Sequence, residues 1–106
     1  MFARYVTMHL KSGNLAEFNR ILEKEVLPVL QRQKGFRDEI VLINQGGSEV
    51  VGISIWDHKE SAETYNREKY PDIQQLLTKV LDGTPQVKTY DVNHSTAHKI
   101  AAHATA

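Results

Sequence analysis

Three aromatic residues in the middle of the chain have side chains that could bind or orient a flat molecule: Trp56, Tyr65 and Tyr70. Gly52 and Ser54 precede Trp56 at a spacing of two, so on a strand they share its face and leave one side of the indole open for stacking. The tyrosine hydroxyls can donate a hydrogen bond to a carbonyl or a phenolate. Each residue also has a structural interpretation, in which the indole fills the core and the tyrosine rings pack against it.

Two further residues carry side chains that could act on a ligand through their charge or by exchanging a proton. Arg4 shares a strand face with Val6 and Met8, and near the rim of a pocket its guanidinium can pair with an anionic ligand or with a carboxylate such as Asp91. His9 falls on the opposite face of the same strand. We therefore expect His9 at an interface or a rim, and not as a base in the pocket.

The histidines near the C-terminus are the only candidate metal ligands in the sequence. His94, His98 and His103 are spaced four and five residues apart, which on a helix would place two of them on one face. No carboxylate cluster accompanies them, and we predict no metal site.

Composition excludes several classes of protein. The 106 residues contain no cysteine, so disulfides, thiolate nucleophiles and cysteine metal sites are absent. Thirteen basic and thirteen acidic residues balance and alternate in sign, which argues against nucleic-acid binding. No apolar run approaches the roughly 20 residues of a membrane span, and the first ten residues lack the pattern of a signal peptide. These features predict a cytoplasmic protein.

Periodicity divides the chain into alternating strands and helices. Glycine and proline separate the elements, and Asn14 with Glu17 has the form of a capping box before the first helix. Pro28 should kink or shorten that helix, and Pro71 should split the second. We predict strands over residues 2–10, 36–44, 50–56 and 86–92, and helices over 14–34 and 57–82.

The order of these elements predicts an α+β fold, a ferredoxin-like β-α-β-β-α-β antiparallel sheet with both helices on one face. The run Ile40 to Ile43 predicts a strand buried on both faces, and Val51, Ile53 and Ile55 are also apolar opposite the helix side. Because two helices cover only one face, we expect a homodimer. We assign residues 1–92 to this domain and residues 93–106 to a tail that is flexible or packed on the partner.

The segment from Ile53 to Tyr65, ISIWDHKESAETY, together with the strand, helix and hairpin before it, resembles the antibiotic biosynthesis monooxygenase-like family of dimeric α/β barrels. The likeness spans residues 2–92. Its most specific feature is Trp56 closing a strand ahead of an Ala-x-x-Tyr helix start. The resemblance implies a pocket between helices and sheet in each subunit, and oxygenation without metal or flavin.

The resemblance also implies which residues surround a substrate. Trp56, Tyr65 and Tyr70 are the catalytic candidates. The substrate-binding candidates are Arg4, Val6, Met8, Phe18, Leu22, Gly52, Ser54 and Leu77. This chain departs from the family's oxygenases at two positions, where Gly52 replaces an asparagine and Ala62 replaces a tyrosine. Heme degradation is disfavoured, because Val6 and Leu77 stand where those members need an asparagine and a histidine.

Three hypotheses about function follow. The leading one is a cofactor-independent oxygenase-like homodimer that takes a small aromatic or quinonoid compound. The second is a non-catalytic or stress-associated barrel protein that holds a hydrophobic molecule in the same pocket. In the third, core side chains fill the pocket and only the dimer has a role.

Overall fold

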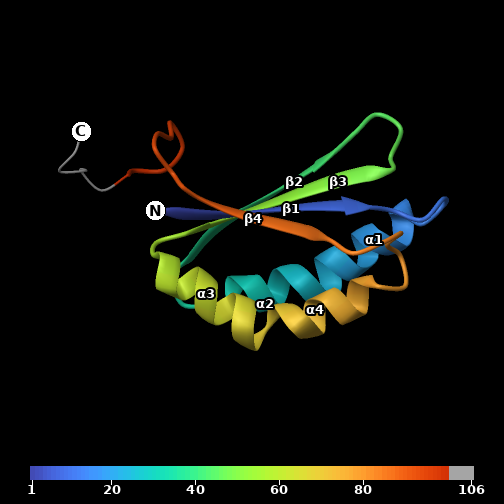
Figure 1. Cartoon of the computed structure of the whole chain (residues 1–106), viewed down its shortest axis with the longest axis horizontal. Coiled ribbons are helices and arrows are strands. Elements are labelled where there is room, and N and C mark those ends of the chain that lie inside the picture. Colours follow the sequence, from blue (N-terminus) through green and yellow to red (C-terminus); the bar gives the residue numbers. More distant parts are fainter. Residues whose placement is uncertain (101–106) are drawn as a thin grey trace.

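The computed structural model describes residues 1–100 and shows one four-stranded antiparallel sheet with all helices on one side (Figure 1). The elements are β1 (Phe2–His9), α1 (Leu15–Ile21), the π-helical turn η1 (Leu22–Val26), α2 (Leu27–Gln31), β2 (Phe36–Ile43), β3 (Glu49–Trp56), α3 (Lys59–Glu68), α4 (Tyr70–Leu77) and β4 (Gln86–Asp91). The predicted α+β, ferredoxin-like order of elements is confirmed.

The strands lie in the order β2-β3-β1-β4. Strand β2 is therefore an edge strand, and its residues Ile40 and Leu42 are 43% and 50% exposed. The prediction that this strand is buried on both faces is wrong for the single chain. Its apolar run alternates across the sheet, because Val41 turns toward the helices while Ile40 and Leu42 turn away.

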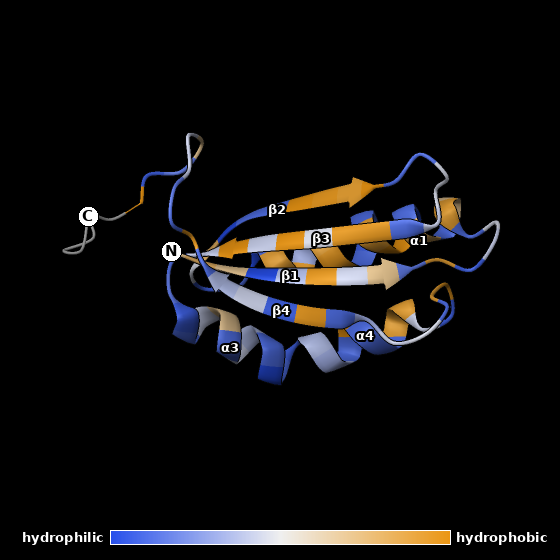
Figure 2. Cartoon of the chain, turned by 45° about the horizontal axis from the view of Figure 1, so that its top comes forward, coloured by the Kyte–Doolittle hydropathy of each residue, from blue (hydrophilic) through white to orange (hydrophobic). Residues whose placement is uncertain are grey.

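The core lies between the sheet and the helices. The two central strands send alternate side chains into it: Phe2, Arg4, Val6 and Met8 from β1, and Val50, Gly52, Ser54 and Trp56 from β3. Phe18, Ile21, Val26 and Leu30 close it from the first helical layer, and Ala62, Tyr65, Ile73 and Leu77 from the second. Apolar side chains of β2 and β3 also point to the opposite face, which has no helix over it (Figure 2).

The first helical segment begins where predicted, but not through the predicted cap. Asn14 stands at the N-cap position without capping the helix; its side-chain amide donates instead to the Ser12 carbonyl at 3.0 Å. Glu17 pairs with Arg20 at 2.8 Å. The capping-box prediction is wrong, because a charged partner one turn along competes for the carboxylate.

Both prolines act as predicted. Pro28 lies in the first turn of α2, directly after the wide turn η1, and Pro71 lies in the first turn of α4, after a break at Lys69. A proline lacks the N–H that continues a helix, so each interruption falls where the backbone ladder loses a donor. The interruptions bend the two helical layers around the core.

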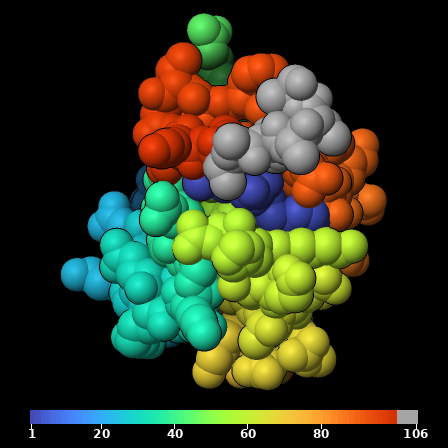
Figure 3. Space-filling model, turned by 90° about the vertical axis from the view of Figure 1, so that its left-hand side faces the viewer, coloured from blue at the N-terminus to red at the C-terminus, as the bar shows by residue number. Residues whose placement is uncertain are grey.

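The chain after β4 lies against the N-terminal end of the sheet, where the red C-terminal segment borders the blue start of the chain (Figure 3). The Val92 N–H donates to the Met1 carbonyl at 2.9 Å, and His98 Nε2 lies 3.1 Å from Asp38 Oδ2. His103 belongs to residues 101–106, outside the described part. None of the helices within residues 1–100 is long and apolar enough to cross a membrane.

Candidate functional site

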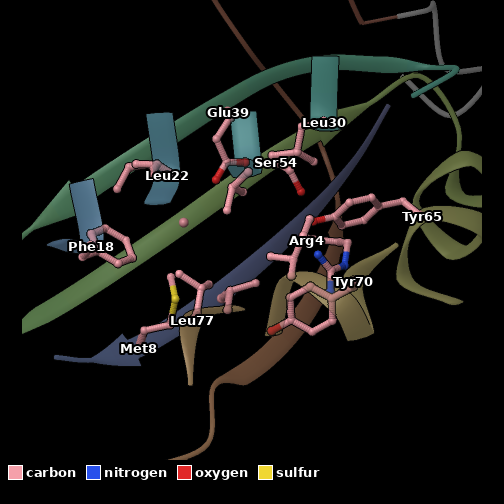
Figure 4. A pocket seen from close by; sticks show the side chains of 15 residues that line it. Arg4, Met8, Phe18, Leu22, Leu30, Glu39, Ser54, Tyr65, Tyr70 and Leu77 are labelled. Atoms are coloured by element: carbon pink, nitrogen blue, oxygen red, sulfur yellow. The ribbon is translucent and has the colours of Figure 1, made fainter. Parts of the chain in front are cut away.

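A partly open cavity of about 50 Å³ lies between the sheet and the helices (Figure 4). Its walls are mostly aliphatic and aromatic, with five polar side chains facing inward. The apolar lining residues are Val6, Met8, Phe18, Leu22, Val26, Leu30, Val41, Gly52, Ile73 and Leu77, and the polar ones are Arg4, Glu39, Ser54, Tyr65 and Tyr70.

Strand register explains how three of the polar residues meet. Ser54 on β3 lies opposite Arg4 on β1 and opposite Glu39 on β2. Directly opposed residues in an antiparallel pair project to the same face. The sheet therefore presents one polar row, Arg4-Ser54-Glu39, across the floor of an otherwise apolar cavity.

Arg4 is buried, with 3% of its surface exposed. Its Nη2 donates to Asn66 Oδ1 of α3 at 2.9 Å. Its guanidinium carbon lies 5.2 Å from the ring centre of Tyr65 and 4.5 Å from that of Tyr70. The expectation of a rim residue that could pair with Asp91 is wrong, because the break between α3 and α4 brings two tyrosines and an asparagine over the guanidinium.

Glu39 is the functional candidate that sequence reasoning missed. Burial raises the pKa of its carboxyl group from 4.5 to about 7, and the positive charge of Arg4 opposes that rise. A Cβ added at Gly52 would lie 3.1 Å from Glu39 Oε2. Because Gly52 has no side chain, it leaves space above β3 for the Glu39 carboxylate. Glu39 stands two residues before Val41 and therefore shares its strand face, and this spacing was the feature of the sequence that could have identified it.

The two tyrosines form the wall beside Arg4. Burial raises the pKa of both hydroxyls, and Arg4 opposes the rise at each. Their ring centres are 6.2 Å apart. Both therefore stay protonated at neutral pH and can act as hydrogen-bond donors to a bound oxygen.

Trp56 lies behind this wall and does not line the cavity. Its indole is completely buried and its Nε1–H donates to Ser54 Oγ at 2.9 Å. The ring packs against Phe36 and Tyr65, with centroid distances of 5.5 and 5.2 Å. In this arrangement the indole supports Tyr65 and orients Ser54, and its stacking face is already occupied.

The other substrate-binding candidates from the sequence all line the cavity: Arg4, Val6, Met8, Phe18, Leu22, Gly52, Ser54 and Leu77, together with Tyr65 and Tyr70. The sequence did not single out Glu39, Val26, Leu30, Val41 or Ile73. His9, at the far end of β1, is exposed and paired with Glu49 in the register. It lies outside the cavity.

A second cavity of about 190 Å³ meets Arg4 from the other side, between α3 and β4. Lys59, Glu63 and Asn66 of α3 and Thr89 of β4 line it. Asn66 therefore holds Arg4 at the partition between the two cavities. Across residues 1–100, no group of three or more His, Asp or Glu side chains is placed to hold a metal ion.

Comparison with known proteins shows the fold. No family model matches the chain, and no curated protein matches it in sequence. Solved structures do match. The monooxygenase from the gene ActVA-Orf6 of Streptomyces coelicolor, in complex with the ligand nanaomycin D, is 14% identical with a TM-score of 0.75, over 89% of this chain and 88% of that one. The chain has the same fold as this monooxygenase.

Two other structures extend this likeness. One named antibiotic biosynthesis monooxygenase is 12% identical with a TM-score of 0.71, over 87% of this chain and 98% of that one. The protein NE2512 of unknown function from Nitrosomonas europaea is 16% identical with a TM-score of 0.74, over 96% and 95% of the two chains. The resemblance predicted from the segment around Trp56 is thus confirmed at the level of fold.

Proposed function

We propose that the chain is a monooxygenase-like enzyme that binds a small aromatic or quinonoid compound in the cavity, with Glu39 as the proton acceptor. The observation that carries the proposal is a carboxyl group with a pKa of about 7 in an apolar cavity that also holds a guanidinium and two phenols. A base works best when its pKa lies near the working pH. Ring-shaped ligands suit the aliphatic and aromatic walls.

For a hydroquinone, the proposed reaction begins when the Glu39 carboxylate takes the proton of a phenol. The phenolate then passes an electron to O₂, and the resulting radicals combine to form a C–O bond. Loss of water from the peroxide gives a hydroxyquinone. One oxygen atom of O₂ stays on the ring, the other leaves as water, and the ring supplies all four electrons.

The tyrosines and Arg4 have supporting roles in this proposal. A protonated Tyr65 or Tyr70 donates to an oxygen of the bound ring, and Arg4 favours the anionic form of the substrate electrostatically. Trp56 packs against Tyr65 and keeps it in place. No step requires a metal or flavin, in line with what the resemblance implies.

The second candidate function is ligand binding without catalysis. Gly52 and Ala62 stand where the family's oxygenases have an asparagine and a tyrosine, and Ala62 is itself buried against the core. The polar groups that those side chains would supply are therefore replaced here by hydrogen atoms and methyl groups. In that case the cavity holds a hydrophobic molecule that leaves unchanged.

Oxygen uptake with a hydroquinone separates the two functions. We expect uptake by the native protein, rising with pH as Glu39 ionises near pH 7. Glu39→Gln should lower the rate by about 100-fold or more, the usual contribution of a general base. Tyr65→Phe and Trp56→Phe should lower it less. The control is Glu49→Gln, whose side chain is exposed at the start of β3.

Three other outcomes would count against the enzyme or against the role given to Glu39. Tight binding of the hydroquinone without oxygen uptake supports the carrier. An unchanged rate in Glu39→Gln contradicts the role of this carboxylate. Absence of both binding and uptake means that core side chains fill the cavity.

A further inference from the structure

Arg4 is the only charged side chain that is buried within residues 1–100. None of the ion pairs in that part of the chain includes it. Its side-chain hydrogen-bond partners are neutral: the amide oxygen of Asn66 and the hydroxyl of Tyr70. The guanidinium thus lies at the partition between two cavities without a directly paired anion in the described part of the chain.

The neighbours of Arg4 offset only part of the cost of burying that charge. Tyr65 and Tyr70 each place an aromatic face against the guanidinium, which is a favourable contact. A buried guanidinium without a paired anion is nevertheless unfavourable, because the contacts replace only part of its hydration. Glu39 lines the same cavity, but no carboxylate of residues 1–100 forms an ion pair with the guanidinium. The site therefore has room for an anion that pairs directly with Arg4.

The size of the cavity limits what can occupy it. A volume of about 50 Å³ holds about four waters, at ~10–15 Å³ for each. An apolar cavity of about 150 Å³ admits a benzene ring, so a single ring here already requires the lining side chains to move apart, and a polycyclic compound would require a much larger displacement. Figure 4 shows Phe18, Leu22 and Met8 at one end of the cavity and Arg4 between the two tyrosines at the other.

We infer that the ligand is a single-ring aromatic carboxylate, whose ring lies among Phe18, Leu22 and Met8 and whose carboxylate pairs with Arg4. Arginine suits this role because its planar fork matches the two oxygens of a carboxylate. Glu39 and Ser54, in the same polar row, lie along the length of the ring. This inference rests on the proposed function in that it names the substrate class of the same cavity.

Two ligands that differ only in charge test it: 2,5-dihydroxybenzoate and 2,5-dihydroxybenzamide. Titration calorimetry without oxygen measures binding alone. We expect the native protein to bind the benzoate at least tenfold more tightly than the benzamide. Equal affinities, tighter binding of the benzamide or binding of neither ligand would overturn the inference.

Variants locate the preference at Arg4. Arg4→Met should remove it and Arg4→Lys should keep part of it. Arg37→Met should leave it unchanged, because Arg37 lies on the surface and pairs with Asp57 at 3.1 Å. A preference that survives in folded Arg4→Met overturns the inference. If Arg4→Met fails to fold, as judged by circular dichroism, the comparison of the two ligands on the native protein and on Arg4→Lys decides.

Oxygen uptake with the same ligands keeps this inference separate from the proposed function. Selective binding of the benzoate without uptake contradicts the enzyme and supports the anion site. Uptake with a neutral hydroquinone, together with equal affinity for the benzoate and the benzamide, supports the enzyme and contradicts the anion site.

Discussion

At the scale of single residues, Glu39 combines position and pKa in a way that no other described carboxylate does. It stands on an edge strand, yet its side chain turns inward beside Gly52. Burial favours its neutral form, since an ionised carboxylate loses more hydration than a neutral one. Its ionisation should therefore affect both the chemistry and the stability of the protein.

We predict that Glu39 makes the folded state less stable as pH rises. Its pKa is about 7 in the folded protein and 4.5 ordinarily, so between these values the folded chain binds more protons than the unfolded chain. The free energy of unfolding should then fall from about pH 4.5 to pH 7 and level off above it. At about 1.4 kcal/mol per pH unit, the loss is about 3 kcal/mol at most.

Urea denaturation at pH 5 and pH 8 measures this effect. Glu39→Gln cannot ionise and should lose less stability over that interval than the native protein. Glu49→Gln, changed at an exposed position, should behave like the native protein. Parallel pH profiles for the native protein and Glu39→Gln would contradict the raised pKa.

The residue scale also shows where sequence reasoning ended. Spacing along β1 and β3 was enough to place Arg4, Gly52 and Ser54 on the pocket face, because the side-chain period of a strand is local. It could not show that Trp56 would turn behind Tyr65, since that orientation depends on contacts with Phe36 and α3. Glu39 was overlooked because a carboxylate beside apolar residues is usually solvent-facing.

At the scale of elements, the corner between α2 and β2 is tightly constrained. Gly35 has a φ of +82°, and its carbonyl accepts the Asp57 N–H at 2.8 Å. A Cβ at this position would overlap the hydroxyl of Ser61 in α3. Gly35 therefore allows the end of α2, the start of β2 and the start of α3 to pack closely together.

We predict that Gly35→Ala destabilises the protein by about 3 kcal/mol. About 1–2 kcal/mol comes from the left-handed backbone conformation, and the remainder from the overlap with Ser61. Gly13→Ala is the matched control, because Gly13 has a φ of +76° and no atom within 4 Å of an added Cβ. Urea denaturation should show a larger loss for Gly35→Ala, and equal losses would mean that α3 moves aside at no cost.

Element boundaries were largely predictable, whereas the geometry inside them was not. Glycine and proline interrupt the pattern at fixed points, so the strands and the split second helix followed from the sequence. The wide turn η1 did not follow from the sequence, because it falls inside the region where one continuous helix was predicted. A π-turn rotates the residues around it, which a period of 3.6 does not anticipate.

At the scale of the whole molecule, the sheet has two different faces. The helices cover the one that holds the cavity. The other carries Val51 and Ile53 in its centre, with Ile40, Leu42 and Tyr90 exposed around them. Fully burying a side chain of this kind contributes roughly 1.5–3 kcal/mol. We therefore propose that two copies pack through this face, which would complete the core of each chain.

The proposed homodimer predicts a specific response to charge on the uncovered face. Sedimentation equilibrium should give twice the chain mass at micromolar concentration. Ile40→Lys combined with Leu42→Lys should give a folded monomer, because two desolvated ammonium groups cost far more than the contacts they replace. Leu15→Lys, which changes an exposed leucine on α1 outside that face, should leave the mass unchanged. A native protein that sediments as a stable monomer would show that this face of the sheet needs no partner. The proposed homodimer would then be wrong, and the cavity within each chain would be unaffected.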